Sequence, residues 1–310
     1  MINFHARAGL VACALLCAPL LSACLGGDSD TGSASTSRAT SNEIRPNVFE
    51  VNNFTPLPAA RAPSAELQAT RERILGPNAM DPDQVKFWWV GVSSFIVSMQ
   101  GHLFLMDAWE IVGVHANYVP IGREELAAIQ PEAIFIGHGH FDHAADAGYV
   151  AGLSNALLVA GSNVCDIARE RAASEGIPNT FPCLNLGDQT TPGAGSTRAI
   201  QIWEDVAPVH VVQHTHSAAE PADLLSGGMP LVYIPDVLTY PTYLNTSLAE
   251  ALRFVGTLRD DGGVGQPAGG TWAYHFRAGD FAWFWHNSTG VMKAGNPESE
   301  AVANALSTLP

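Results

Sequence analysis

The sequence predicts an α/β fold in which layers of helices cover layers of β-strands. Three strand patterns follow one another between residues 86 and 107, strands and helices then alternate up to residue 173, and a hairpin pattern precedes the last helix. The chain has 310 residues, of which 47% are hydrophobic and 15% are charged. It can therefore bury one substantial core, and we expect one large domain with a tail.

Three short strands are predicted at the start of the large domain. Residues 86–92, 94–100 and 102–107 are short strand-like runs, and turn residues at 91–93 and 100–101 separate them. We therefore expect a three-stranded meander.

Helix and strand patterns alternate in the next part of the chain. Apolar residues at helical spacing predict helices at 122–130, 143–153 and 163–173, and short apolar runs predict strands at 132–136 and 156–160. This alternation is typical of α/β layering.

The last third combines further strands with one long insert. We predict strands at 198–204, 208–214, 271–277 and 280–286, and a helix at 298–306. Residues 221–270 are punctuated by Pro and Gly, and a connection of this length is usually a lid or a substrate-binding insert.

The N-terminus has the features of an export signal. A short apolar run ends in Leu-Ser-Ala-Cys at residues 21–24, which resembles the bacterial lipobox. By this resemblance residues 1–23 are a lipoprotein signal peptide, and Cys24 is lipidated and anchors the exported protein in a membrane. No Asp follows Cys24, which favours the outer membrane or cell surface. An ordinary secreted protein cut elsewhere is the alternative.

The composition after Cys24 predicts a tether. Residues 26–42 are almost entirely Gly, Ser, Thr, Asp and Ala, so they cannot offset the entropy of becoming ordered. We therefore assign residues 24–65 to a flexible tether and residues 66–310 to the folded domain.

Two cysteines remain once the signal peptide and the lipidation site are accounted for. In an oxidising compartment, we expect Cys165 and Cys183 to form a disulfide rather than to stay as free buried thiols. Closing a loop of this length stabilises a fold by about 3 kcal/mol.

The charge of the chain indicates which partners it can take. The formal net charge is -15, which repels a phosphate backbone, so we expect no nucleic acid partner. The expected partners are a small-molecule or lipid-like substrate and, through the lipid anchor, a membrane.

A cluster of metal-ligand residues follows the strand predicted at 132–136. Residues 137–146 read Gly-His-Gly-His-Phe-Asp-His-Ala-Ala-Asp, which brings His138, His140, Asp142 and His143 into one small volume. Imidazole nitrogen and carboxylate oxygen are the ligands that zinc and similar ions prefer. Histidines also cluster on surfaces, but such clusters rarely follow a buried strand, so we predict a metal site.

The spacing H-x-H-x-D-H resembles the signature of the metallo-β-lactamase superfamily. Residues 87–95 and 103–107 resemble the opening strands of the branch that contains the ascorbate-phosphate lactonases and the N-acylphosphatidylethanolamine-hydrolysing phospholipase D. The resemblance covers about residues 86–290, and it implies a four-layer αββα sandwich.

The same resemblance assigns metal ligands. It implies that His138 and His140 hold a first ion, that Asp142 and His143 hold a second, and that Asp107 supports the site from a strand end. A solvated turn residue is the alternative for Asp107.

A third histidine for the first ion is expected near residue 214. The motif places it after a strand, and both His214 and His216 fit that place with the same strand parity. A following Ser favours His216 and a preceding Gln favours His214, so both remain candidates. His210 has the same parity and is expected to be structural.

The resemblance also implies a carboxylate that bridges two ions in a G-D-T-G-like turn. The best match is Trp-His-Asn-Ser-Thr-Gly at residues 285–290, which puts Asn287 at the Asp position. An amide oxygen is neutral and binds two cations less well than a carboxylate. Asp236, within the insert, is the rival candidate.

After this turn the family continues through a helix, another strand and a loop whose histidine completes the second site. Here residues 298–306 supply the helix, and the sequence ends at Pro310. We therefore expect the sandwich to lack its C-terminal strand and histidine loop, and to hold one well-bound ion with low activity. His275 and His286 are expected to be strand residues rather than replacement ligands.

The function that these features predict is metal-dependent hydrolysis. A metal-bound hydroxide would attack a lactone, another cyclic ester or amide, or a phosphodiester, with Zn²⁺ as the expected cofactor and Mn²⁺ or Fe²⁺ as alternatives. Asp142 or the spare histidine would pass the proton to the leaving group. The competing hypothesis is a catalytically impaired lipoprotein that binds a metal or another ligand.

Overall fold

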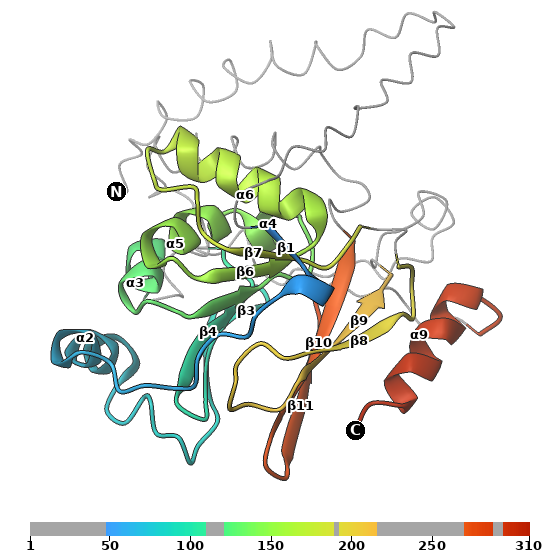
Figure 1. Cartoon of the computed structure of the whole chain (residues 1–310), viewed down its shortest axis with the longest axis horizontal. Coiled ribbons are helices and arrows are strands. Elements are labelled where there is room, and N and C mark those ends of the chain that lie inside the picture. The colour runs from blue at the N-terminus through green and yellow to red at the C-terminus, as the bar shows by residue number, and fades with distance from the viewer. Residues whose placement is uncertain (1–47, 110–120, 189–191, 216–269, 288–293) are drawn as a thin grey trace, which may run out of the picture. The chain divides into compact units, whose positions relative to one another are not determined.

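Two β-sheets form the inside of the fold (Figure 1). The seven-stranded sheet has the order β1-β7-β6-β5-β4-β3-β2, and its strands are β1 (Val48–Glu50), β2 (Lys86–Gly91), β3 (Ser94–Met99), β4 (His102–Met106), β5 (Ala133–Phe135), β6 (Leu157–Ala160) and β7 (Cys183–Asn185). The second sheet has the order β11-β10-β9-β8, and its strands are β8 (Thr197–Ile200), β9 (Val209–His214), β10 (Thr271–Ala278) and β11 (Phe281–Trp285). This computed structural model describes residues 48–109, 121–188, 192–215, 270–287 and 294–310.

Strand direction divides the larger sheet into two parts. β2, β3 and β4 pair antiparallel as a meander, whereas β4, β5, β6, β7 and β1 pair parallel. Every pairing in the second sheet is antiparallel. The carboxyl ends of the parallel strands therefore share one edge of the sheet, where polar groups meet.

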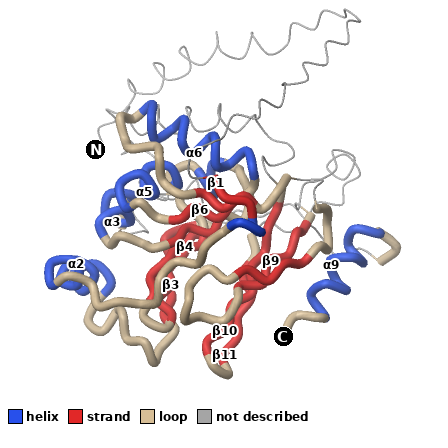
Figure 2. Tube along the Cα trace, viewed as in Figure 1, coloured by secondary structure: helices blue, strands red, loops and turns tan. Residues whose placement is uncertain are grey.

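Three apolar layers hold the sheets and helices together. The first, which includes Leu105 and Val164, lies between the larger sheet and helices α3 (Arg123–Ala128), α5 (Ala147–Ser154) and α6 (Ser162–Ser174). The second lies between the two sheets and includes Phe104 and Trp203. The third packs Val212 against α9 (Pro297–Ser307), and Figure 2 shows α9 on the opposite side of the strands from α3, α5 and α6. The layers thus run αββα, which confirms the fold predicted from the sequence.

Alternation along β4 shows how the sequence builds these layers. Leu103 and Leu105 belong to the layer under the helices, whereas Phe104 and Met106 face the second sheet. Successive side chains of a strand point to opposite faces, so a strand buried on both sides is apolar throughout. All four residues are fully buried.

Most predicted elements are present; most have shorter bounds, whereas α6, α9 and β10 are slightly longer than predicted. The helix predicted at 143–153 is two helices, α4 (Phe141–Ala144) and α5, and the break lies where the Asp146 amide donates to the Ala108 carbonyl. The strand predicted at 198–204 ends at Ile200. Four elements were not predicted: β1, β7, the 3₁₀ helix η2 (Val51–Asn53) and α2 (Ala65–Leu75).

The folded part begins earlier than the predicted boundary at residue 66. β1 pairs parallel with β7, and the Leu57 amide donates to the Ile202 carbonyl at 2.7 Å. Phe49 and Phe54 pack against the layer between the sheets, which stabilises this segment on the sandwich. Residues 48–65, which the sequence predicts to be part of the tether, therefore belong to the folded part.

The predicted disulfide is present. Cys165 lies on α6 and Cys183 is the first residue of β7, with a Cα–Cα distance of 6.1 Å. Both are buried, so the bond joins the helical layer to the sheet from within the core.

Several predictions concern residues outside the described ranges. These are the signal peptide, Cys24, the tether up to residue 47, residues 221–269 of the insert, His216 and Asp236. None of the helices within the described ranges is long and apolar enough to cross a lipid bilayer.

Candidate metal centre

The centre lies where β4 and β5 end. Met106 pairs with Phe135, so the residues that follow each strand emerge at the same edge of the sheet, and the Asp107 amide donates to the Phe135 carbonyl at 2.7 Å. β5 leads through Ile136 and Gly137 to His138, and the single turn of α4 then presents Asp142 and His143.

The four motif residues come together as two pairs of donor atoms. His138 Nε2 lies 3.1 Å from His140 Nδ1, and His143 Nε2 lies 3.5 Å from Asp142 Oδ2. The rings of His138 and His143 are 4.1 Å apart, so the two pairs adjoin. The structure therefore brings together all four residues that the motif predicts as metal ligands.

The spacing within each pair fits a divalent ion. Zinc binds nitrogen and oxygen at 2.0–2.2 Å in tetrahedral geometry, so two ligands of one ion lie about 3.4 Å apart. Within the described ranges, no group of three His, Cys, Asp or Glu side chains is arranged to hold an ion. Each of the two pairs thus supplies two ligands for an ion. The remaining ligands of each ion would have to come from residues outside these pairs.

A buried carboxylate orients His143 from behind. Asp107 Oδ2 accepts from His143 Nδ1 at 2.7 Å and from the Ser93 hydroxyl at 2.8 Å, and Asp107 Oδ1 accepts from the Gly137 amide at 2.9 Å. A carboxylate on the outer nitrogen fixes the ring and directs the other nitrogen toward the ion. Asp107 is therefore a support residue, as the resemblance implied, and not a solvated turn residue.

Asn287 does not lie where a bridging ligand would. Its Oδ1 is 2.9 Å from His138 Nδ1, on the side of the ring away from His140, and its Nδ2 donates to Asp107 Oδ2. The amide thus contacts the outer nitrogen of His138, and the expectation that it bridges two ions does not match this position. The cause is chemical, because an amide pairs with an acceptor through its nitrogen, which a carboxylate cannot do.

The third-histidine candidates remain open. His214 ends β9 beside Thr271, and the next residue of β10, Trp272, donates its amide to the Gly137 carbonyl at 2.6 Å. This register carries the end of β9 toward the motif loop. Burial is the main cause that lowers the pKa of His214. The hydrogen bond to the Thr215 carbonyl opposes this effect, and the charge of His286 lowers the pKa by a smaller amount. A neutral imidazole is the form that binds metals.

Two other histidines lie away from the donor pairs. His210 on β9 is opposite His275 on β10, with ring centroids 5.9 Å apart. Both are strand residues of the second sheet, as expected from the sequence.

Two contributors to the centre were missed from the sequence. Ser93 lies in the turn between β2 and β3, and its hydroxyl is also 2.9 Å from His143 Nδ1. Gly137 lies against Asn287, because a Cβ at this position would come within 2.3 Å of the amide. The turn pattern at 91–93 and the Gly before the first His were visible in the sequence, but their partners were not.

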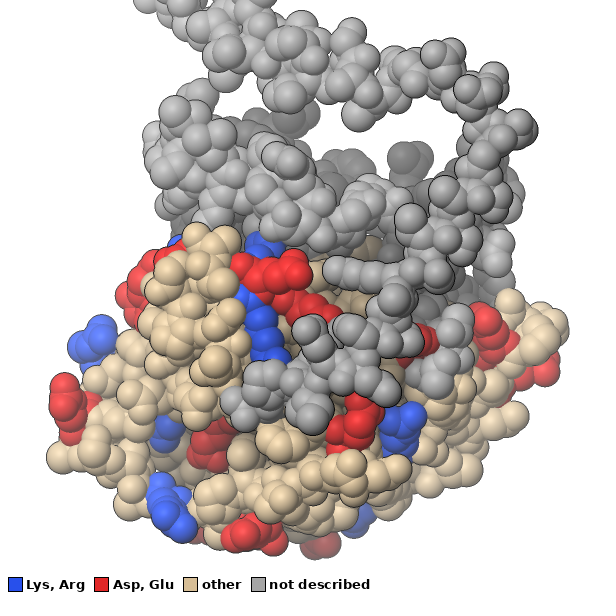
Figure 3. Space-filling model, turned by 45° about the horizontal axis from the view of Figure 1, so that its top comes forward, with Lys and Arg blue, Asp and Glu red and all other residues tan. Residues whose placement is uncertain are grey.

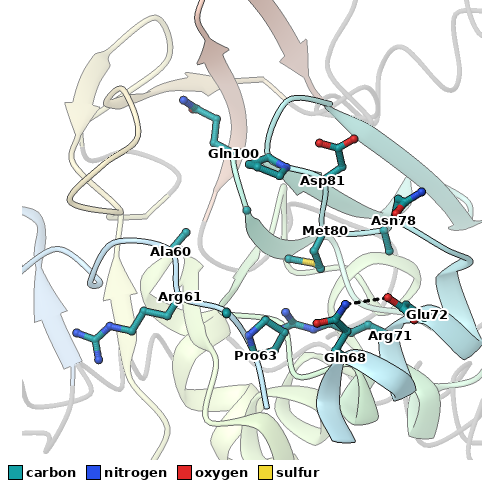
Figure 4. Close-up of a pocket in the computed structure, with 14 residues that line it drawn as sticks. Ala60, Arg61, Pro63, Gln68, Arg71, Glu72, Asn78, Met80, Asp81 and Gln100 are labelled. Carbon is teal, nitrogen blue, oxygen red and sulfur yellow. Dashed lines mark hydrogen bonds between the residues drawn. The ribbon is translucent and has the colours of Figure 1, made fainter. Parts of the chain in front are cut away.

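A cavity elsewhere lacks this chemistry. It measures about 580 Å³ and lies between α2 and the turn that joins β3 to β4, at the opposite end of β4 from Asp107 (Figure 4). Arg71 in its wall donates to the Ile129 and Gln130 carbonyls, and Gln68 donates to Glu72. These bonds are structural, and no imidazole of the described residues lines this cavity, so the candidate functional site is placed at the histidine cluster.

Comparisons with known proteins relate part of the chain to named hydrolases. No family model matches the sequence. A UPF0173 metal-dependent hydrolase of Pyrobaculum neutrophilum is 33% identical over 109 residues, which are 34% of this chain and 44% of that protein. Another, of Dinoroseobacter shibae, is 26% identical over 155 residues, which are 48% of this chain and 62% of that protein. The chain thus spans about half the length of the relatives it matches.

Solved structures give more distant similarities. Igni18, a metallo hydrolase from Ignicoccus hospitalis, is 20% identical with a TM-score of 0.30, covering 43% of this chain and 50% of that one. The MIM-2 metallo-β-lactamase is 15% identical with a TM-score of 0.31, covering 72% of this chain and 68% of that one.

Proposed function

We propose that this chain is a metal-dependent hydrolase of the metallo-β-lactamase superfamily. The observation that carries the proposal is the pair of donor sets, His138 with His140 and Asp142 with His143, at the spacing that one ion requires of two ligands. The partial similarity to proteins named metal-dependent hydrolases supports it.

The residues around the ion have distinct roles in this proposal. A bound divalent ion supplies Lewis acidity, which lowers the pKa of water and polarises a carbonyl or phosphoryl oxygen. Asp107 holds the ring of His143, and Asp142, whose side chain is partly exposed, can carry a proton to the leaving group. Zinc fits the nitrogen-rich donors, and Mn²⁺ or Fe²⁺ fits them next best.

Exposed aromatic side chains on the edge strand β2, of which Trp89 lies toward the end of the sheet that carries the centre, favour a substrate with an apolar group. On the edge strand β2, Phe87 and Trp89 are 44% and 50% exposed, and the Phe87 ring packs against Trp283 of β11 at 4.9 Å. Trp89 lies opposite Phe95, which lies opposite Met106, the residue before Asp107. We therefore propose a lactone, cyclic ester or amide, or phosphodiester that carries an alkyl or aromatic substituent.

Charge is consistent with a small-molecule or lipid-like substrate rather than a nucleic acid. On the face drawn in Figure 3, the described Lys and Arg are interspersed with Asp, Glu and uncharged residues and form no continuous basic patch. The formal net charge of -15 acts in the same direction.

Export as a membrane-anchored lipoprotein is the proposed location. The sequence around Cys24 supports it, and the disulfide between Cys165 and Cys183 supports an oxidising compartment. Anchoring would be by the acyl chains on Cys24, at the outer membrane or the cell surface.

The test is hydrolysis of lactones and phosphodiesters, with and without an octyl substituent, after loading with Zn²⁺ or Mn²⁺. The variant His138→Ala with His140→Ala should lose activity, and His210→Ala, a histidine outside the donor pairs, should keep it. Trp89→Ala should reduce the preference for the octyl substrates, whereas Leu153→Ala, which removes an exposed apolar side chain on α5, should not. Equal activity of the double variant and the parent protein would refute the proposal.

The competing function is an impaired lipoprotein that binds a metal or another ligand. The position of Asn287 favours it, because the described residues offer no carboxylate at the bridging position. Tight metal binding together with no turnover of any substrate in the panel would select this alternative.

A further inference from the structure

We infer that Asn287 is a positioning residue that sets the orientation of one histidine in each donor pair, His138 and His143, and that it is not a metal ligand. The inference rests on the proposed function, since it concerns the same histidines. Asn287 is buried and lies two residues after the end of β11, so the edge of the second sheet reaches into the centre.

The orientation of the amide follows from its partner Asp107. A carboxylate can only accept hydrogen bonds, so the Asn287 atom that lies 2.5 Å from Asp107 Oδ2 must be the nitrogen. The Asn287 oxygen then faces His138 Nδ1 at 2.9 Å. An amide oxygen can only accept, so His138 carries its proton on Nδ1 and presents the lone pair of Nε2 toward His140.

The same amide acts on the second pair through Asp107. His143 Nδ1 and Asn287 Nδ2 are 3.0 Å apart, and both donate to Asp107 Oδ2. The shared oxygen fixes the outer nitrogen of His143, so its Nε2 faces Asp142. One neutral amide therefore holds one histidine directly and the other through the carboxylate.

The surroundings leave the amide little freedom to move. Gly137 approaches it so closely that any larger residue would collide with it, and Trp285 on β11 donates from Nε1 to the Ser93 carbonyl at 3.3 Å. Ser93 in turn donates to Asp107. The end of β11 is thus attached to the turn that carries Ser93, and this attachment holds Asn287 between Asp107 and His138.

This arrangement explains why an amide is suited to the position. A carboxylate at 287 could accept from His138, but it could not donate to Asp107, and two carboxylates would then lie in contact in a buried place. Asn287 is therefore complementary to Asp107 rather than a weakened form of a bridging Asp.

The substitution Asn287→Asp distinguishes a bridging metal ligand from a positioning amide, because the two roles predict opposite changes in Zn²⁺ affinity. A bridging ligand would be improved, so Zn²⁺ affinity would rise. A positioning amide would be lost, so we expect Zn²⁺ affinity, measured by competition with a chromophoric chelator, to fall by about 10- to 100-fold. A rise in affinity would overturn the inference.

Two further readouts use the metal-free protein. Long-range ¹H–¹⁵N NMR should show His138 protonated on Nδ1, and Asn287→Ala should convert part of the population to the Nε2–H form. In addition, Asp107→Asn combined with Asn287→Asp should recover part of the urea stability lost in Asn287→Asp alone, because one donor and one acceptor again face each other. An unchanged His138 tautomer in Asn287→Ala, or no recovery in the double variant, would contradict the inference even if the parent protein binds no metal. Absence of metal binding in the parent protein would instead count against the proposed function.

Discussion

His102 makes a specific pH dependence of stability testable. The ring is fully buried at the start of β4, its Nδ1 lies 2.6 Å from Glu132 Oε2, and its Nε2 lies 2.9 Å from Asp205 Oδ1. Both carboxylates only accept, so both ring nitrogens must donate and the ring is an imidazolium. Burial by itself would lower the pKa of His102, but the hydrogen bonds and charges of Glu132 and Asp205 together raise it above its ordinary value.

The direction of the effect follows from this pKa. Because the pKa of His102 is higher in the folded than in the unfolded protein, its contribution to stability is fully present below the unfolded-state pKa of about 6.5. That contribution is lost as the pH rises through the folded-state pKa of His102. The pKa of Asp205 is lowered, since the hydrogen bonds from the Ala60 amide and His102 outweigh its desolvation, so its contribution is lost only in acid. The cluster therefore stabilises most between about pH 4 and pH 6.5.

The perturbation is His102→Gln, which keeps a polar side chain but removes the charge. Hydrogen bonds to a charged group contribute about 1.5–3 kcal/mol each, and because water reaches both carboxylates, we expect a total loss of about 2–4 kcal/mol at pH 5.5. Urea unfolding at pH 5.5 and 8.5 measures the free energy of unfolding. The difference in the free energy of unfolding between parent and variant should shrink at pH 8.5. A difference of equal size at both pH values would refute the charged-ring explanation.

Three further predictions concern other parts of the chain. Thiol labelling of the urea-unfolded exported protein without reductant should find Cys165 and Cys183 unreactive, and replacing both by Ser should lower the free energy of unfolding by about 2–4 kcal/mol; labelling of both would contradict this. Gly137→Ala should weaken Zn²⁺ binding because its Cβ would displace the adjoining amide, whereas Gly148→Ala, which collides with α6, should lower stability without changing Zn²⁺ affinity; equal Zn²⁺ affinities of parent and Gly137→Ala would contradict it. Cys24→Ser should release the protein from membranes, since the acyl chains are the proposed anchor, and a variant that still sediments with membranes would argue against lipidation.

The layers of the fold were predictable because apolar periodicity reports burial directly. β4 is apolar at every position after His102 since both faces are covered, and α9 and the β10–β11 hairpin have clear boundary residues. β1 and β7 have three residues each, too few to show a period; β7 forms by pairing with both β6 and β1, and β1 forms by pairing with β7. α2 was hidden because one of its two buried residues is Arg71, whose charge masks the buried face.

The motif residues were also predictable, since they are close in sequence. Their supports were not, because Asn287 and Asp107 are 180 positions apart and meet only once the two sheets pack. The sequence shows which residue occupies a position but not which partner its amide faces. For that reason the sequence predicts Asn287 at the bridging position of a metal site, whereas its contacts are with Asp107 and the outer nitrogens of His138 and His143.

Metal content tests the central claim most directly. After dialysis against metal-free buffer and loading with Zn²⁺, plasma mass spectrometry should find one tightly bound ion per chain in the parent protein. The same content is expected in His210→Ala, and it should be lost in His138→Ala with His140→Ala. Full metal content in the double variant, or none in the parent protein, would contradict a metal centre at the H-x-H-x-D-H motif.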